Sequence, residues 1–334
     1  MPTAGSQVIL CDVPIRFDTY EGCSHACSYC FAQRNRDISK IKMGESVNSL
    51  LNFIKGYRDK NTNWCDWDIP LHWGGMSDPF QPIERETGRS LECLRVLAET
   101  GYPFVVSTKN ALIAEGEYFE LIKRCNCVVQ FSAICERYDK LESGASTFAE
   151  RMKAAKKISA YKRVIVRCQP YMPNVFKDVL QNIKVFKDAG VYGCVFEAMK
   201  AQRITQGMIK LGADYVYPIS ILKPQFEEIK KRLHDNGMKF YSGENRLRKM
   251  GDNLCCCGIE GMGWKVNTAN LNHYLYDKEN YQFTEAQKAP EGGMAFQSLA
   301  QRASTRGLTH LSYERCMEMC VGTKSYLETL MPIK

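Results

Sequence analysis

Three cysteines crowd into eight positions near the amino terminus of the chain. Cys23, Cys27 and Cys30 have the spacing C-x3-C-x2-C within the stretch "EGCSHACSYCF". Cysteine thiolates hold iron–sulfur clusters, and a short spacing lets one loop reach several irons. A 4Fe-4S cluster needs four ligands and this loop supplies three, so the motif predicts one iron that lacks a protein ligand. An open coordination position distinguishes a reactive metal site from a structural one.

A zinc site is the main alternative for this loop. Zinc prefers four ligands, and His25 is the nearest candidate for the fourth. His25 lies between Cys23 and Cys27, where joint ligation by one short loop is awkward. The spacing therefore favours the iron–sulfur cluster, and zinc or a structural group of thiols stays an alternative.

A second group of cysteines lies near the other end of the chain. Residues 251–264, "GDNLCCCGIEGMGW", contain Cys255, Cys256 and Cys257. Neighbouring side chains diverge, so all three cannot easily bind one metal. Two of them would form a second iron–sulfur cluster or a zinc site with Cys316 and Cys320, which are four residues apart and would share a helix face. Thiols that donate hydrogen or an electron to a substrate, and ordinary packing, are the alternatives.

Apolar runs alternate with helical patterns along the first two thirds of the chain. The runs are rich in Val, Ile, Phe and Tyr, which suits buried strands. They cover residues 15–20, 68–75, 103–108, 127–132, 163–170 and 193–198. Apolar residues recur with a helical period in residues 46–57, 90–101, 147–158, 176–190 and 223–237. The alternation predicts an α/β fold with a parallel sheet and right-handed crossovers.

This number of units is smaller than in a full barrel, so we expect a partial (βα)6 barrel, with a flat doubly wound sheet as the second choice. Either arrangement gathers ligands at the carboxyl ends of the strands, where the first cysteine loop lies. We expect the barrel core to cover residues 1–238. A Cys-rich C-terminal extension, residues 239–334, would hold the auxiliary metal site or cap the substrate. Its first residues, "KFYSGEN", are a candidate for one more strand.

The cysteine motif resembles that of the radical S-adenosylmethionine (SAM) enzymes, because Tyr29 precedes its third cysteine and it follows the first strand of a βα series. The resemblance covers about residues 14–200. It implies a partial barrel of the TIM-barrel type whose open iron binds SAM. The cluster would cleave SAM to methionine and a 5′-deoxyadenosyl radical, which abstracts hydrogen from the substrate. The cofactors then carry the chemistry and the protein supplies orientation. An electron donor such as flavodoxin or ferredoxin is an implied partner.

The stretch "WGGMSDPFQPIE" at the end of the second strand looks like the SAM amino-group motif in relatives of spore photoproduct lyase. Gly74 and Gly75 would let a ligand approach the backbone, and Ser77 and Asp78 offer acceptors to an ammonium group. Lys109, which ends the third strand, resembles the residue that holds the SAM carboxylate. The resemblance adds further SAM contacts, which are Tyr29, Ser132, Arg151 and Arg167.

Gly75 also marks a departure from the spore photoproduct lyase branch. In that branch a cysteine just before the Ser-Asp pair returns hydrogen to the repaired thymine, and the aligned position of this sequence is Gly75. The resemblance therefore predicts the fold and the SAM site of the branch but not its thymine repair.

The composition bears on the substrate and the compartment. The formal net charge is +8, and a positive field attracts polyanions. With the nearest relatives, this favours a nucleic acid or a nucleotide as substrate. A peptide substrate is one alternative, and a non-catalytic iron–sulfur or zinc protein that binds nucleic acid is another. The sequence shows no signal peptide and no membrane-spanning apolar run, which predicts a cytoplasmic protein without a membrane partner.

Overall fold

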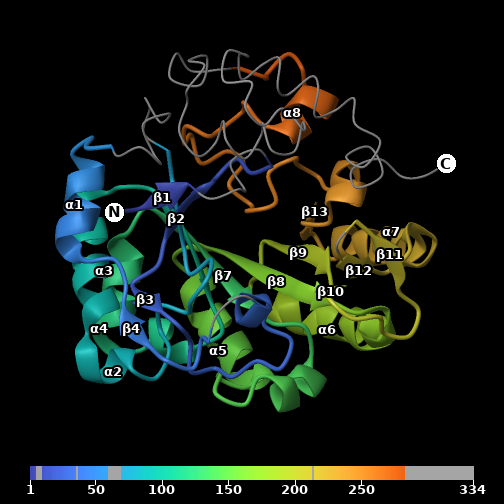
Figure 1. The fold of residues 1–334 in the computed structure, drawn as a ribbon, viewed down its shortest axis with the longest axis horizontal. Coiled ribbons are helices and arrows are strands. Elements are labelled where there is room, and N and C mark those ends of the chain that lie inside the picture. Colours follow the sequence, from blue (N-terminus) through green and yellow to red (C-terminus); the bar gives the residue numbers. More distant parts are fainter. Residues whose placement is uncertain (5–9, 35–36, 59–68, 213, 283–334) are drawn as a thin grey trace.

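A curved, mainly parallel sheet forms the centre of the molecule (Figure 1). The computed structural model describes residues 1–4, 10–34, 37–58, 69–212 and 214–282. The sheet has the order β1-β2-β5-β6-β7-β8-β9-β13. Its strands are β1 (Thr3–Ala4), β2 (Ile15–Phe17), β5 (Leu71–Trp73), β6 (Phe104–Thr108), β7 (Cys127–Ser132), β8 (Arg163–Tyr171), β9 (Gly193–Ala198) and β13 (Lys239–Ser242).

Neighbouring strands from β2 to β13 are parallel, and only β1 runs antiparallel to its neighbour among the strands of this sheet that the structure describes. Two smaller sheets lie outside it. One pairs β3 (Tyr20–Glu21) with β4 (Lys42–Met43), and the other has the order β10 (Lys200–Ala201), β12 (Asp214–Val216), β11 (Ile209–Leu211).

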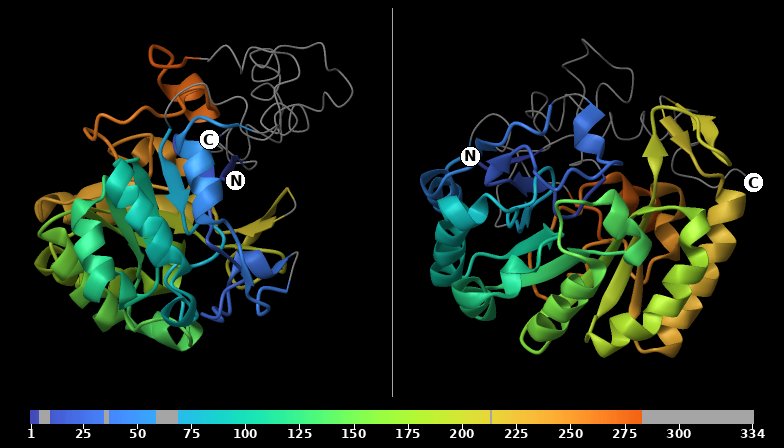
Figure 2. Two further views of the ribbon diagram at one scale, coloured as in Figure 1. Left: turned by 90° about the vertical axis from the view of Figure 1, so that its left-hand side faces the viewer. Right: turned by 90° about the horizontal axis from the view of Figure 1, so that it is seen from below.

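Helices follow the strands along the chain and cover the outer face of the sheet (Figures 1 and 2). They are α1 (Val47–Ile54), α2 (Glu84–Thr87), α3 (Arg89–Thr100), α4 (Gly116–Arg124), α5 (Phe148–Ser159), α6 (Phe176–Asp188) and α7 (Ile219–Asp235). The last helix, α8 (Leu271–Tyr276), belongs to the chain that follows β13 and lies apart from the others in Figure 1. Ser46 and Thr147 begin α1 and α5 as capping boxes, in which the side chain accepts from the third backbone N–H of the helix. Trp73 is fully buried beneath these helices and packs against Phe17 and Phe104.

The inner face of the sheet is covered by the chain that follows β13. Because side chains alternate along a strand, one row of apolar residues points away from the helices. That row packs against the loop at residues 255–259 and contains Val105, Val128, Ile165, Val195 and Tyr241. Gly258 has φ +69°, and a Cβ there would lie 2.5 Å from Ile165 Cδ1. Glycine therefore lets this loop enter the concave side of the sheet.

The predicted α/β class and partial barrel are confirmed, and each expected strand run and helix pattern contains a strand or a helix. Lys239–Ser242, the candidate for one more strand, is β13 and pairs in parallel with β9. It carries the sheet beyond residue 238, and the division at that residue stays a prediction. Among the described residues, no helix has the length and apolar character needed to cross a bilayer.

Candidate active site

The cysteine loop lies between β3 and a short 3₁₀ helix, Phe31–Arg34. Cys27 is buried, while Cys23 and Cys30 are partly exposed. The backbone N–H of Cys23 donates to the carbonyl of Ile38 at 2.8 Å, and that of Cys30 donates to Cys27 at 3.1 Å. Ala26 has a φ of +48°, which is unusual for a residue other than glycine. The loop is therefore sharply bent between its first two cysteines.

Gln81 anchors this loop to the end of β5, and its side chain is fully buried. Its Oε1 accepts from the backbone N–H of Ser24 at 2.9 Å, and its Nε2 donates to the Gly22 carbonyl at 3.2 Å. The hydroxyl of Ser77 donates to the same Gly22 carbonyl at 2.6 Å. The motif "SDPFQPIE" therefore holds the backbone on both sides of Cys23.

Asp78 connects the cysteine loop to the end of β6. Its carboxylate accepts from the backbone N–H of Lys109 at 2.6 Å and from the Thr108 hydroxyl at 2.8 Å. It also accepts from the N–H of Phe80 at 2.9 Å and lies 3.5 Å from His25 Nδ1. These contacts engage both of its oxygens, and its role toward a SAM ammonium group stays a prediction.

Glu142 brings together three of the predicted SAM contacts. Its buried carboxylate accepts from the hydroxyl of Tyr29 and pairs with Arg151 at 2.6 Å and with Lys109 at 3.8 Å. Arg151 also donates to the backbone carbonyl of Ser132 at 2.6 Å. Glu142 therefore links the cysteine loop to the end of β6 and to α5. Arg151 extends this contact to the end of β7. Sequence reasoning missed Glu142, which no motif marks.

The two glycines of the predicted SAM motif have different surroundings. Gly74 has φ +86°, and a Cβ there would lie 2.3 Å from the backbone oxygen of Ser107. At Gly75 the nearest atom to such a Cβ would be Arg16 Cδ, at 3.7 Å. Packing of the chain therefore requires Gly74, whereas space beside Gly75 is open to a ligand.

Burial makes the thiols of Cys23 and Cys27 hard to ionise without a cation. It raises the pKa of Cys23 to about 11, with a contribution from the charge of Asp78. It raises the pKa of Cys27 to about 12, although Lys109 opposes this. His25 is buried, its pKa is lowered by burial, and its Nε2 has no hydrogen-bond partner among the described residues. Within the same residues, no three His, Cys, Asp or Glu side chains are grouped to hold a metal ion.

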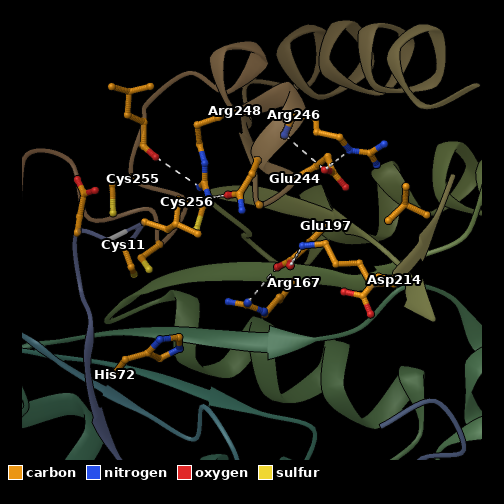
Figure 3. A pocket seen from close by; sticks show the side chains of 18 of the residues that line it. Cys11, His72, Arg167, Glu197, Asp214, Glu244, Arg246, Arg248, Cys255 and Cys256 are labelled. Carbon is orange, nitrogen blue, oxygen red and sulfur yellow. Dashed lines mark hydrogen bonds and ion pairs between the residues drawn. The ribbon is translucent and has the colours of Figure 1, made fainter. Parts of the chain in front are cut away.

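A cavity of about 330 Å³ lies against the inner face of the sheet (Figure 3). Its wall includes His72, Arg167 and Glu197, with Arg167 Nη2 3.7 Å from Glu197 Oε2. His72 Nε2 lies 3.2 Å from the Ser107 hydroxyl, and burial followed by the charge of Arg167 lowers its pKa to about 3. Ser132 and Arg167 are register partners on β7 and β8, so the cavity adjoins the predicted SAM contacts.

Four thiols gather beside this cavity. The side chain of Cys257 contacts those of Cys11, Cys255 and Cys256, although Cys11 precedes β2 at the other end of the chain. The pKa of Cys256 is lowered by its hydrogen bond with Cys257 and by the charge of Arg248. Sequence reasoning missed Cys11, because no spacing links it to the later three. Cys316 and Cys320 lie outside the described residues, so the predicted auxiliary site stays a prediction.

Comparisons with known proteins identify the fold. No family model matches the sequence. An uncharacterised protein of Mycobacterium bovis and two counterparts from Mycobacterium tuberculosis are 27% identical to the chain over 109 residues. The match spans 30% of this chain and 32% of each relative, so the chain aligns with about a third of the length of these relatives.

Solved structures of spore photoproduct lyase share the architecture. The complex with dinucleoside spore photoproduct matches with a TM-score of 0.56 and 16% identity, over 69% of this chain and 77% of that one. A double mutant with bound AdoMet and the same ligand matches with a TM-score of 0.55 and 15% identity, over 69% and 76%. The predicted resemblance is therefore confirmed at the level of the fold.

Proposed function

We propose that this protein is a radical SAM enzyme whose 4Fe-4S cluster is held by Cys23, Cys27 and Cys30. The observation that carries the proposal is the position of these thiols on one bent loop, after the first parallel strand of a partial barrel with the spore photoproduct lyase fold. The donor types fit the group, because one loop supplies three thiols, although in the described residues these side chains are not gathered around a single point. When bound, the reduced cluster supplies the electron that cleaves SAM to methionine and a 5′-deoxyadenosyl radical.

The residues around the loop would bind and orient SAM. Lys109 and Arg151 bring two positive charges to the ends of β6 and β7, and Glu142 fixes both of them. Charge-assisted hydrogen bonds from such groups suit the SAM carboxylate. Gly75 leaves room beside the backbone for the ligand. The loop and the end of β5 would be positioned around SAM by Tyr29, Gly74, Ser77, Asp78 and Gln81.

A nucleic acid or a nucleotide is the proposed substrate. The net charge of +8 supports it, because positive potential attracts phosphate groups. The spore photoproduct lyase structures, which are described as complexes with a dinucleoside photoproduct, point the same way. The cavity on the inner face of the sheet is the proposed position of the reacting group, since Arg167 lines it and neighbours Ser132. A low-potential protein such as flavodoxin or ferredoxin would supply the electron.

Anaerobic reconstitution tests the proposal directly. The holoprotein should contain about four irons and release 5′-deoxyadenosine when dithionite and SAM are added. Cys30→Ala should lose most of the iron and all of the product. Cys93→Ala is the matched control, because Cys93 is a buried cysteine in α3 away from the loop, and it should keep both. A holoprotein that binds iron yet releases no 5′-deoxyadenosine would contradict the proposal.

The substrate class has its own measurement. Binding to a single-stranded oligonucleotide should weaken steeply as salt rises, because each neutralised phosphate releases a counterion. Binding that is weak and insensitive to salt would count against nucleic acid and leave a free nucleotide or a peptide.

A further inference from the structure

The cavity is lined by polar groups that are buried and have unused hydrogen-bonding capacity. Arg246, Arg248 and Glu244 line it, and their exposed fractions are 5%, 6% and 1%. Nη2 of Arg246, Nε of Arg248 and Oε2 of Glu244 have no hydrogen-bond partner among the described residues. A buried polar group without a partner destabilises the fold. Three such groups around one cavity indicate a ligand that completes them.

Arg248 differs from the other cations of the cavity in its partners. It donates to Asn245 Oδ1 at 2.9 Å and to the Leu254 carbonyl at 3.5 Å, which are neutral acceptors. Its guanidinium also contacts the Cys256 side chain, beside which it lies in Figure 3. No carboxylate pairs with it among the described residues, whereas Arg246 Nε lies 2.8 Å from Glu244 Oε1. The Cys256 thiol, whose pKa Arg248 lowers, and the more distant Glu197 offset this buried charge in part. An oxyanion in the cavity would complete the compensation.

The position of these residues in the fold agrees with a binding role. Glu244 lies just after β13, separated from it by Gly243, and Arg246 and Arg248 lie on the 3₁₀ helix Asn245–Met250 that follows. The carboxyl ends of parallel strands are where open α/β sheets bind their ligands. Arg246 is held in place by Glu244 and by the Tyr217 carbonyl, to which Nη1 donates at 3.1 Å. Its guanidinium is therefore fixed, and its Nη2 has no hydrogen-bond partner among the described residues.

We propose that this cavity binds a compact oxyanion group, a phosphate or a carboxylate, at Arg248 and Arg246, while a hydrogen-bond donor of the same ligand meets Glu244. A guanidinium presents its N–H groups in a fork that matches the paired oxygens of either group. His72 stays neutral nearby and adds no competing charge. That the ligand is the substrate rests on the proposed function, but the binding of the oxyanion does not.

Direct titration tests the site in the full-length holoprotein without turnover. Inorganic phosphate and acetate are titrated separately by calorimetry at constant ionic strength, with chloride as the reference anion. Saturable binding of phosphate, of acetate or of both is expected, and the stronger anion identifies the source of the oxyanion. Absence of saturable binding by either anion overturns the proposal.

Variants assign the binding to Arg248. Arg248→Gln should weaken the preferred anion by about tenfold or more, because a charge-assisted hydrogen bond is lost. Arg248→Lys, which keeps the charge without the fork, should weaken it less. Arg232→Gln is the control, since Arg232 is an exposed arginine paired with Glu228 on α7, and it should bind like wild type. Equal affinity of wild type and Arg248→Gln contradicts the assignment.

The wild-type protein provides a readout that survives if Arg248→Gln does not fold. Cys256 is partly exposed, lines the cavity and contacts Arg248. The bound anion should slow alkylation of Cys256 by iodoacetamide several-fold, as measured by peptide mass spectrometry, whereas chloride should not. An alkylation rate that phosphate and acetate leave unchanged overturns the proposal. Release of 5′-deoxyadenosine without substrate is measured in parallel, so the failure of radical chemistry and the failure of this site are told apart.

Discussion

The side-chain oxygen of Gln81 accepts a hydrogen bond from the backbone N–H of Ser24 at 2.9 Å, which joins the end of β5 to the loop of Cys23, Cys27 and Cys30. Gln81 is fully buried, so without this hydrogen bond its side-chain oxygen would have no water to bond to instead. The segment proposed to bind SAM and the segment proposed to bind the cluster are therefore one mechanical unit. A substitution in the segment proposed to bind SAM should therefore alter the structure of the cysteine loop.

Replacing Gln81 by leucine tests this coupling. The buried Gly22 carbonyl loses the amide donor while the N–H of Ser24 loses its acceptor, so we expect stability to fall by about 1–3 kcal/mol. We also expect lower iron content after reconstitution, because the loop is no longer held. Gln225→Leu removes an amide that bonds to Tyr171 and the Pro173 carbonyl instead. It should be destabilising yet load iron normally, and equal iron content in both variants would refute the coupling.

The carboxylate of Glu142 should contribute more to stability than its exposed counterparts. Glu142→Gln leaves Lys109 and the buried Arg151 without this counter-charge, and we expect a loss of about 2–3 kcal/mol in urea unfolding. Glu120→Gln breaks the exposed pair with Lys123 and should cost less than about 1 kcal/mol. If the two variants unfold at the same urea concentration, the ion pairs of Glu142 stabilise the fold no more than the exposed pair of Glu120 does.

Much of the barrel could be predicted from the sequence, because its strands are short runs of β-branched and aromatic residues between amphipathic helices. The helix pattern at residues 46–57 contains α1, which begins at the capping box of Ser46. Five cysteines lie among apolar residues of a helix or lie in or beside strand-like runs, and all five are buried: Cys93, Cys125, Cys127, Cys168 and Cys194. The three strands β10, β11 and β12 have two or three residues each, too few for an alternating pattern to appear.

The contacts of the site were less predictable, because they join residues that are distant in sequence. Tyr29 and Glu142 are 113 positions apart, and nothing local to either residue indicates the pairing. Cys11 meets Cys257 in the same way, because the chain after β13 crosses the inner face of the sheet and bonds to residues 10–12 at its other edge. Motifs marked Lys109 and Asp78 correctly as residues at strand ends, but only the fold assigns their present partners.

His273 should make stability depend on pH. Burial lowers its pKa, but hydrogen bonding to Asp12 and the charges of Asp12 and Asp277 outweigh burial, so the folded pKa is raised above 6.5. A raised pKa stabilises the fold fully below the unfolded pKa of about 6.5, and this stabilisation is lost as pH rises through the folded value. The stability difference between wild type and His273→Gln, measured by urea unfolding, should therefore be larger at pH 6 than at pH 9. An equal difference at both pH values would contradict this.

Gly74 and Gly75 allow the structural and ligand-binding roles of adjacent residues to be separated. Gly74→Ala forces a Cβ to 2.3 Å from a backbone oxygen at a φ of +86°, and we expect a loss of more than about 2 kcal/mol in urea unfolding. Gly75→Ala meets no atom closer than 3.7 Å and should unfold within about 0.5 kcal/mol of wild type.

If SAM packs against the open side of Gly75, the added methyl group of Gly75→Ala should weaken SAM by about tenfold in equilibrium dialysis of the reconstituted protein. The matched stability of this variant makes the dialysis interpretable, because a folding defect cannot lower its affinity. Wild-type affinity in Gly75→Ala would mean that SAM does not approach the backbone here. The space beside Gly75 would then belong to another part of the site, and Lys109 and Arg151 would have to hold SAM from the opposite side.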